Sequence, residues 1–202
     1  MKGAQTARES ETERRVGMGS CDDCVVDESR RVAAVLVPVF RDALEQLRIV
    51  LIVRSDRGLH GGQLALPGGK ADADDESLVA TALREAEEEI GLAPAEVDVI
   101  AELTPVHSGP TRFEVHPFLA RIPPDVRWRP SEDEVVDVLT PLVADLGRAD
   151  ARRELLFTSA RFPDGLLVDG IPVGEHVLWG MTLGLLDDVV PRLLAGEWDD
   201  RL

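Results

Sequence analysis

The stretch GGKADADDESLVATALREAEEEIGL, residues 68–92, is the part of this chain that decides its fold. It opens on Gly68 and Gly69, and adjacent glycines permit backbone angles closed to other residues and let the main chain approach a ligand closely. A helical apolar pattern follows over about residues 75–90, and Gly91 suits the left-handed position just past a helix end. The stretch therefore predicts a glycine turn, a loop and an amphipathic helix in succession.

The predicted helix has an apolar face and an acidic face. The apolar face is expected to enter the core and comprises Val79, Ala82, Leu83, Ala86 and Ile90. On the acidic face Glu85, Glu88 and Glu89 are spaced i, i+3 and i+4, and like charges at these spacings oppose helix formation by roughly a few tenths of a kcal/mol per pair. A glutamate run is usually a solvated surface, but carboxylates are also the ligands that Mg²⁺ prefers. Arg84 is four residues before Glu88 and is predicted to orient that carboxylate.

Short apolar runs on both sides of the helix predict strands of one sheet. These runs are residues 32–40, 48–53, 97–103 and 114–122, each bounded by charged, Gly or Pro residues. Helical spacing returns at residues 141–155 and 181–194, where Pro191 is expected to kink or break the second helix. We therefore predict one mixed α/β domain over residues 29–202, preceded by a polar, loosely ordered extension over residues 1–28.

Composition limits the class of partner. Among 202 residues, 38 Asp and Glu outnumber 22 Lys and Arg, which gives a formal charge of −16. No basic stripe is available for nucleic acid or an anionic membrane. A cytoplasmic protein is expected, because no apolar stretch approaches the roughly 20 residues that span a bilayer and no signal peptide is evident. Cys21 and Cys24 form a lone C-x-x-C without two further zinc ligands nearby, so they are predicted to be incidental thiols, with a redox or intermolecular role as the alternative.

The residues of the glycine turn and acid helix resemble the Nudix box, written G-x5-E-x7-R-E-U-x-E-E-x-G-U with U an apolar residue. The matching positions are Glu76, Arg84, Glu85, Ala86, Glu88, Glu89, Gly91 and Leu92. Six residues separate Gly69 from Glu76 where the box has five, which we interpret as a one-residue insertion in the loop. The resemblance implies the Nudix fold, an α/β/α sandwich around a mixed β-sheet in which the box forms a loop-helix-loop.

The resemblance also implies an activity, hydrolysis of the diphosphate linkage of a nucleoside diphosphate derivative, with Mg²⁺ or Mn²⁺ as cofactor. Divalent ions share phosphoryl charge and activate water, which suits that reaction. The metal ligands that it implies are Gly69, Glu85, Glu88 and Glu89, and the catalytic residues are Arg84, Glu88, Glu89 and Glu134. Glu134 is the downstream carboxylate that supplies a further metal ligand or the general base in many family members, and a surface acid is its alternative interpretation.

Residues outside the box resemble the coenzyme A diphosphatase branch of the family. The run HGGQLALPGG, residues 60–69, is similar to the branch's H-x-G-Q-x-A-F-P-G-G. Further similar runs are FEVHPF at residues 113–118, SEDEV at 131–135 with Pro141-Leu142, and WGMT at 179–182. The substrate contacts that the resemblance implies are Arg54, His60, Gln63, Gly68 and Gly69.

Two departures leave the substrate open. Leu66 replaces the usual aromatic residue, and Gly58-Leu59 stands where basic residues are expected to contact the 3′-phosphate of coenzyme A. ADP-ribose or another nucleoside diphosphate derivative is the alternative substrate. A ligand-sensing module without catalysis is the alternative class, although such a module should have lost a carboxylate of R-E-U-x-E-E and this chain retains them. The expected partner is a small-molecule substrate, with a homodimer left open.

Overall fold

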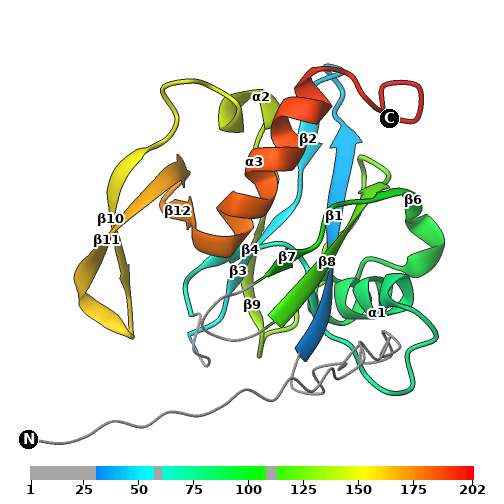
Figure 1. The fold of residues 1–202 in the computed structure, drawn as a ribbon, viewed down its shortest axis with the longest axis horizontal. Coiled ribbons are helices and arrows are strands. Elements are labelled where there is room, and N and C mark those ends of the chain that lie inside the picture. The colour runs from blue at the N-terminus through cyan, green and yellow to red at the C-terminus, as the bar shows by residue number, and fades with distance from the viewer. Residues whose placement is uncertain (1–30, 57–60, 108–112) are drawn as a thin grey trace, which may run out of the picture.

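The computed structural model describes residues 31–56, 61–107 and 113–202, and within these ranges the strands form three sheets. Figure 1 shows β1 (Arg31–Arg41) and β8 (Phe113–Arg121) near the middle of the molecule, with helices α1 (Leu78–Ile90) and α3 (Gly180–Leu194) on different sides of them. The predicted extension over residues 1–28, with Cys21 and Cys24, lies outside the described residues, as do Gly58-Leu59 and His60. No helix in the described ranges is long and apolar enough to cross a membrane.

The largest sheet is mixed and is centred on β1 (Arg31–Arg41) and β8 (Phe113–Arg121), which pair in parallel. Its other strands are antiparallel to their partners: β2 (Leu47–Ile49) and β5 (Gly68–Lys70) flank β1, and β6 (Asp98–Glu102) and β7 (Val106–His107) flank β8. The pairing of β5 with β1 brings the glycine turn onto the central strand.

The prediction of one sheet is wrong, because the apolar run at residues 48–53 divides between two sheets. Its first part belongs to β2, whereas its second part is β3 (Leu51–Arg54), which pairs with β4 (Leu64–Ala65) and β9 (Val135–Leu139). The residues from Ile49 to Ile52 are fully buried. A run buried on both faces has no alternation, so the sequence carries no mark of the point where the chain changes sheet.

The helix predicted at residues 141–155 is mostly wrong. Only Val143–Leu146 forms a helix, α2, and the chain then enters β10 (Arg153–Ser159). Strand β10 pairs with β11 (Phe162–Val173), which pairs with β12 (His176–Trp179), so a third, antiparallel sheet forms in a region where no strand was predicted. The second predicted helix is confirmed as α3 (Gly180–Leu194). It continues through Pro191 without a break, and three more helical residues follow that proline.

Two apolar clusters lie on opposite sides of the central strands. Alternate residues of β1 enter each cluster: Ala34 and Leu36 face α1 (Leu78–Ile90), whereas Val37 and Val39 join the cluster that includes α3. This arrangement confirms the predicted mixed α/β fold with helices on both sides of the strands. It also places α1 against β1, the strand with which the glycine turn in β5 pairs.

Candidate active site

Helix α1 begins later than predicted. It starts at Leu78 because Ser77 is the N-cap, with its Oγ accepting a hydrogen bond from the backbone N–H of Ala80 at 3.2 Å. Its end is as predicted, since Gly91 has φ 70° and ψ 22° and closes the last turn with its own N–H. The residues from Asp72 to Glu76 consequently lie in the loop, where their side chains are available for contacts with the helix.

Gly68 and Gly69 have no side chains, so the backbone of the glycine turn lies directly against its neighbours. Gly68 has φ 147°, and a Cβ at this position would meet the carbonyl oxygen of Ala34 and lie 2.5 Å from Cα of Val35. A Cβ on Gly69 would lie 2.5 Å from the carboxyl carbon of Glu85. The two glycines therefore allow β5 to lie between the central strand and the acid face of α1.

Glu89 is an almost completely buried carboxylate, with 2% of its surface exposed. Its Oε2 accepts a hydrogen bond from the N–H of Gly68 at 2.8 Å. Burial raises the pKa of Glu89 to about 7, and the negative charges of Glu85 and Glu134 add to this effect, while Gly68 and the Arg54 charge oppose it. The carboxylate is therefore held at the glycine turn in an environment that disfavours its charge.

Glu85 is the second carboxylate at the turn, and its side chain is 17% exposed. Burial raises its pKa above the usual value, against the nearby Arg84 guanidinium, and the charges of Glu88 and Glu134 raise it further. Glu85 and Glu89 thus repel each other, and the charge of Glu134 acts on both. A cation bound among these carboxylates would relieve the repulsion.

Arg84 is held mainly by Asp75 rather than by Glu88. Its Nε and Nη2 donate to the two carboxylate oxygens of Asp75 at 3.0 and 3.1 Å, in a bidentate pair. The buried hydroxyl of Thr81 donates to the same carboxylate at 2.8 Å, and these contacts hold the pKa of Asp75 well below its usual value. The predicted contact with Glu88 is confirmed at 3.1 Å, and Glu85 lies 3.0 Å from the same Nη1 atom.

The acid of the loop is therefore Asp75, and the assignment of Glu76 to that place in the box is wrong. Glu76 is exposed and has no described contact with Arg84. Five residues, 70–74, separate Gly69 from Asp75, so the box spacing from glycine to acid is retained and the additional residue follows the acid instead. Allowing aspartate at this position of the motif would have identified Asp75 from the sequence.

The two neighbouring acids make different predictions. We expect Asp75→Asn to lower kcat by about 10–100-fold, because the asparagine amide faces the donors of Arg84 and releases the arginine from the orientation that serves Glu85 and Glu88. Glu76→Gln is the matched control and is expected to stay within about twofold of the wild type. Steady-state kinetics of both variants, with circular dichroism to verify folding, decide the assignment. The opposite ranking would return the role to Glu76.

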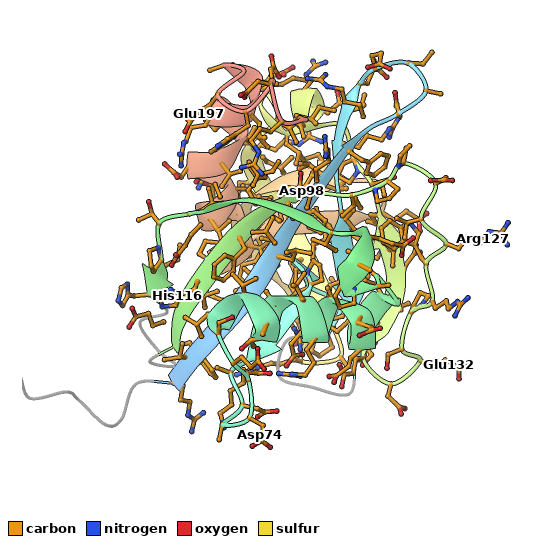
Figure 2. The ribbon with its side chains drawn as sticks, turned by 90° about the vertical axis from the view of Figure 1, so that its right-hand side faces the viewer. Asp74, Asp98, His116, Arg127, Glu132 and Glu197 are labelled. Carbon is orange, nitrogen blue, oxygen red and sulfur yellow. The ribbon has the colours of Figure 1, made fainter. Side chains whose placement is uncertain are left out.

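Glu134 lies in the chain that follows α1, and its charge acts on Glu85 and Glu89. The N–H groups of Arg129 and Ser131 donate to the carbonyl oxygens of Ile90 and Glu89, each at 2.9 Å, so this loop is tied to the end of α1. In Figure 2, Glu132 lies on the same loop, beyond the end of α1 that is opposite Asp74. Glu134 itself is exposed, and its backbone carbonyl accepts from the N–H of Ser55 at 2.8 Å.

The remaining predicted site residues divide into three groups. Glu88 lies on the rim of the site, with its side chain 59% exposed. Arg54 and Gln63 lie side by side, since the N–H of Arg54 donates to the carbonyl of Gln63 at 3.0 Å, and the charge of Arg54 lowers the pKa of Glu89. His60 is outside the described residues, so its predicted substrate contact stays a prediction.

The side chains at the turn have the chemistry of a site for a hard divalent cation. They are carboxylates, two of them have raised pKa values, and a side chain on Gly69 would fill the space beside Glu85. In the part of the chain that the structure describes, no three His, Cys, Asp or Glu side chains are already gathered closely enough to hold a metal ion. The donor set fits Mg²⁺ or Mn²⁺ by type and charge, with the carboxylates spread between the turn and the rim.

The mixed α/β fold, with the glutamates of α1 packed against the glycine turn, agrees with the diphosphate-cleaving hydrolases that the sequence resembles. The NUDIX domain family matches residues 29–158 of the chain. The chain therefore belongs to the Nudix family and is a Nudix hydrolase, a diphosphatase that acts on a nucleoside diphosphate derivative.

Known relatives and solved structures agree with the family. The chain is similar to the "Uncharacterized Nudix hydrolase NudL" of Citrobacter koseri, with 40% identity over 166 residues that cover 82% of this chain and 84% of the relative. The protein of the same name from Escherichia coli O1:K1 is 39% identical over 169 residues, with the same two coverages of 82% and 84%.

Among solved structures, a MutT/nudix family protein from Enterococcus faecalis has a TM-score of 0.56 at 18% identity, covering 84% of this chain and 63% of that one. The NUDIX domain of Shewanella oneidensis NrtR, complexed with ADP ribose, has a TM-score of 0.52 at 20% identity, covering 85% and 93%. These likenesses support the fold.

Proposed function

We propose that this Nudix hydrolase cleaves the diphosphate linkage of coenzyme A or its thioesters, releasing 3′,5′-ADP and 4′-phosphopantetheine, or its acylated form, with Mg²⁺ or Mn²⁺ as cofactor. One observation carries the site of the reaction: Glu85 and Glu89, both with raised pKa values, lie against the glycine turn beside the exposed Glu134. These carboxylates offer negative charge to a divalent cation, because no neighbouring group neutralises them completely.

The metal would be held by the carboxylates of Glu85, Glu88 and Glu89 and by the backbone carbonyl of Gly69. When bound, it would neutralise the diphosphate and lower the pKa of a coordinated water. Glu89 is fixed for this role by the N–H of Gly68, and Arg84 fixes Glu88 and is itself fixed by Asp75. The protein thus orients each carboxylate through a different partner before substrate arrives.

Glu134 is proposed as the general base. Its carboxylate is exposed and near enough to raise the pKa values of Glu85 and Glu89, so it can reach a water at the same site. Glu134 takes a proton from the water as the water oxygen bonds to phosphorus. The bond between phosphorus and the bridging oxygen then breaks. The departing phosphate retains that oxygen and the electron pair of the broken bond.

The choice of coenzyme A rests on the runs around the box. Two of the residues that carry the resemblance, Arg54 and Gln63, are joined by a backbone hydrogen bond, and the charge of Arg54 acts on Glu89. These contacts support a substrate whose diphosphate lies at Glu85 and Glu89, within the influence of the Arg54 charge. ADP-ribose is the alternative substrate, and it is the ligand of the NrtR NUDIX domain whose fold this chain shares.

A substrate panel of coenzyme A, dephospho-coenzyme A and ADP-ribose tests the proposal. We expect the highest kcat/KM with coenzyme A in Mg²⁺ or Mn²⁺, with 3′,5′-ADP as a product resolved by ion-exchange chromatography. The protein should lose activity in a chelator and regain it when either metal is restored. If ADP-ribose were hydrolysed more efficiently than coenzyme A, the alternative would replace the proposal. Absence of turnover on every compound in the panel would refute both.

A further inference from the structure

The turn between β10 and β11 lies beside Gly62, which belongs to the chain segment between Arg54 and the glycine turn. Ser159 and Phe162 are its last paired residues, and Figure 1 shows the hairpin of these two strands projecting from the body of the protein. The family match ends at residue 158, directly before this turn. The turn therefore lies outside the part of the chain that the family model matches.

Arg54 and Gly62 connect the turn with the buried carboxylate of Glu89, through one electrostatic interaction, one hydrogen bond and one close approach. The charge of Arg54 acts on Glu89, and the carbonyl oxygen of Arg54 accepts from the N–H of Gly62 at 2.9 Å. A Cβ on Gly62 would lie 3.6 Å from Cβ of Ser159, which is ordinary van der Waals contact. The hairpin turn thus borders the segment of chain that is hydrogen-bonded to Arg54.

The turn carries a cation stacked on an aromatic ring. Cζ of Arg161 lies 5.6 Å from the centre of the Phe162 ring. Phe162 in turn meets the buried Phe157 in an edge-to-face contact with ring centres 6.3 Å apart, and Phe157 packs against Trp179 at 5.1 Å. The contact with Phe157 restricts the Phe162 ring, so this ring loses little conformational entropy when a ligand binds. The ring supports the exposed Arg161.

We propose that Arg161 and Phe162 form a stacking platform for the nucleobase of the substrate. A planar guanidinium stacks on aromatic faces, and it can lie between the Phe162 ring and a base. The platform would receive the adenine end of the substrate, and it would supply a base contact in a chain that has no tyrosine. The inference rests on the proposed function for the claim that the ligand is a nucleoside diphosphate.

Calorimetric titration with ADP and with inorganic diphosphate, both with Mg²⁺ present, tests the platform without requiring turnover. We expect Phe162→Ala to raise the Kd for ADP about tenfold, since stacking of a base contributes about 1–3 kcal/mol. The Kd for diphosphate, which has no base, should change less than about twofold. Phe113→Ala is the matched control, because Arg31 stacks on Phe113 at 5.8 Å in the first pair of β1 and β8, and it should bind both ligands as the wild type does.

Arg161→Lys separates stacking from charge, because lysine retains the charge and loses the planar group. If the platform stacks a base, Arg161→Lys and Arg161→Ala should weaken ADP binding to a similar extent. Wild-type affinity in Arg161→Lys with loss in Arg161→Ala would indicate a phosphate contact and overturn the inference. Equal weakening of ADP and diphosphate, or no ADP binding by the wild type, would overturn it as well. Failure of the proposed function is read separately, from turnover of the substrate panel by the wild type.

Discussion

Glu89→Gln is expected to lower kcat on the order of 100-fold or more, because it removes the charge of the most buried proposed metal ligand, and changes even to groups behind such ligands reduce activity about 10–100-fold. The variant should fold, since the glutamine oxygen can still accept the hydrogen bond from Gly68. Steady-state kinetics with Mg²⁺ at saturating substrate measure the loss. Glu87→Gln is the matched control, because Glu87 is the exposed neighbour on the same helix.

The same substitution is expected to stabilise the metal-free protein at about pH 8. The pKa of Glu89 is raised from 4.5 to about 7, so between these values the folded state retains a proton that the unfolded state has released. The stability of the metal-free wild type therefore falls as the pH rises through this window, by up to about 3 kcal/mol. Glu89→Gln lacks this loss. Thermal melts with a chelator at about pH 5 and pH 8 should show a pH dependence in the wild type that is smaller in the variant.

Activity and stability should then change in opposite directions at this one residue. The exposed Glu87→Gln control should change neither of them by much. A Glu89→Gln variant that retained near-normal kcat would refute the proposed role as a metal ligand. A variant that melted below the wild type in chelator at about pH 8 would contradict the buried, unfavourable charge.

Gly68→Ala is expected to destabilise the protein by about 2–5 kcal/mol and to abolish most activity. The φ of 147° is closed to alanine, and the added methyl would meet backbone atoms of Ala34 and Val35, which cannot move as a side chain can. Any shift of the turn also displaces the N–H that fixes Glu89. Urea denaturation measures the change in stability, and kinetics below the transition measure the loss of kcat.

Gly184→Ala provides a control of opposite sign. Gly184 lies inside α3, and a Cβ there would have no other atom within 4 Å. Because glycine destabilises a helix interior by about 1 kcal/mol relative to alanine, the variant should be as stable as the wild type or more stable. A Gly68→Ala protein as stable as Gly184→Ala would show that β5 can adopt another path, and the close contact of the turn with β1 would not be required.

The acid helix could be predicted from the sequence because its signals are local. The apolar stripe, the glutamates and Gly91 all lie within one helix, and the structure confirms the stripe, with Ala82, Ala86 and Ile90 fully buried. The carboxylates were predicted to share one patch, but exposure differs between the almost completely buried Glu89 and the exposed Glu88. That difference depends on the strand that packs against the helix, which no spacing within the helix reveals.

The parts that sequence analysis missed depend on contacts between distant residues. Asp75 was overlooked because aspartate and glutamate stand together in the loop, and only the position of Arg84 distinguishes them. Strands β10 and β11 were missed because Leu155 continued an apparent helical spacing, while the pairing that makes it a strand lies across the hairpin at Val168. Contacts of this kind have no periodicity within a single run.

The parallel pairing of β1 with β8 has a consequence for the order in which the site can form. Arg31 pairs with Phe113 and Val39 pairs with Arg121, so β1 lacks its parallel partner until the chain is extended by about eighty residues. Helix α1 and the glycine turn lie between them in sequence. Helix α1 packs on residues of both strands, and the turn pairs with β1. Long-range pairing of this type is slow, because the intervening chain must be ordered first. The segment that holds the proposed chemistry can therefore reach its working shape only after β1 and β8 have paired.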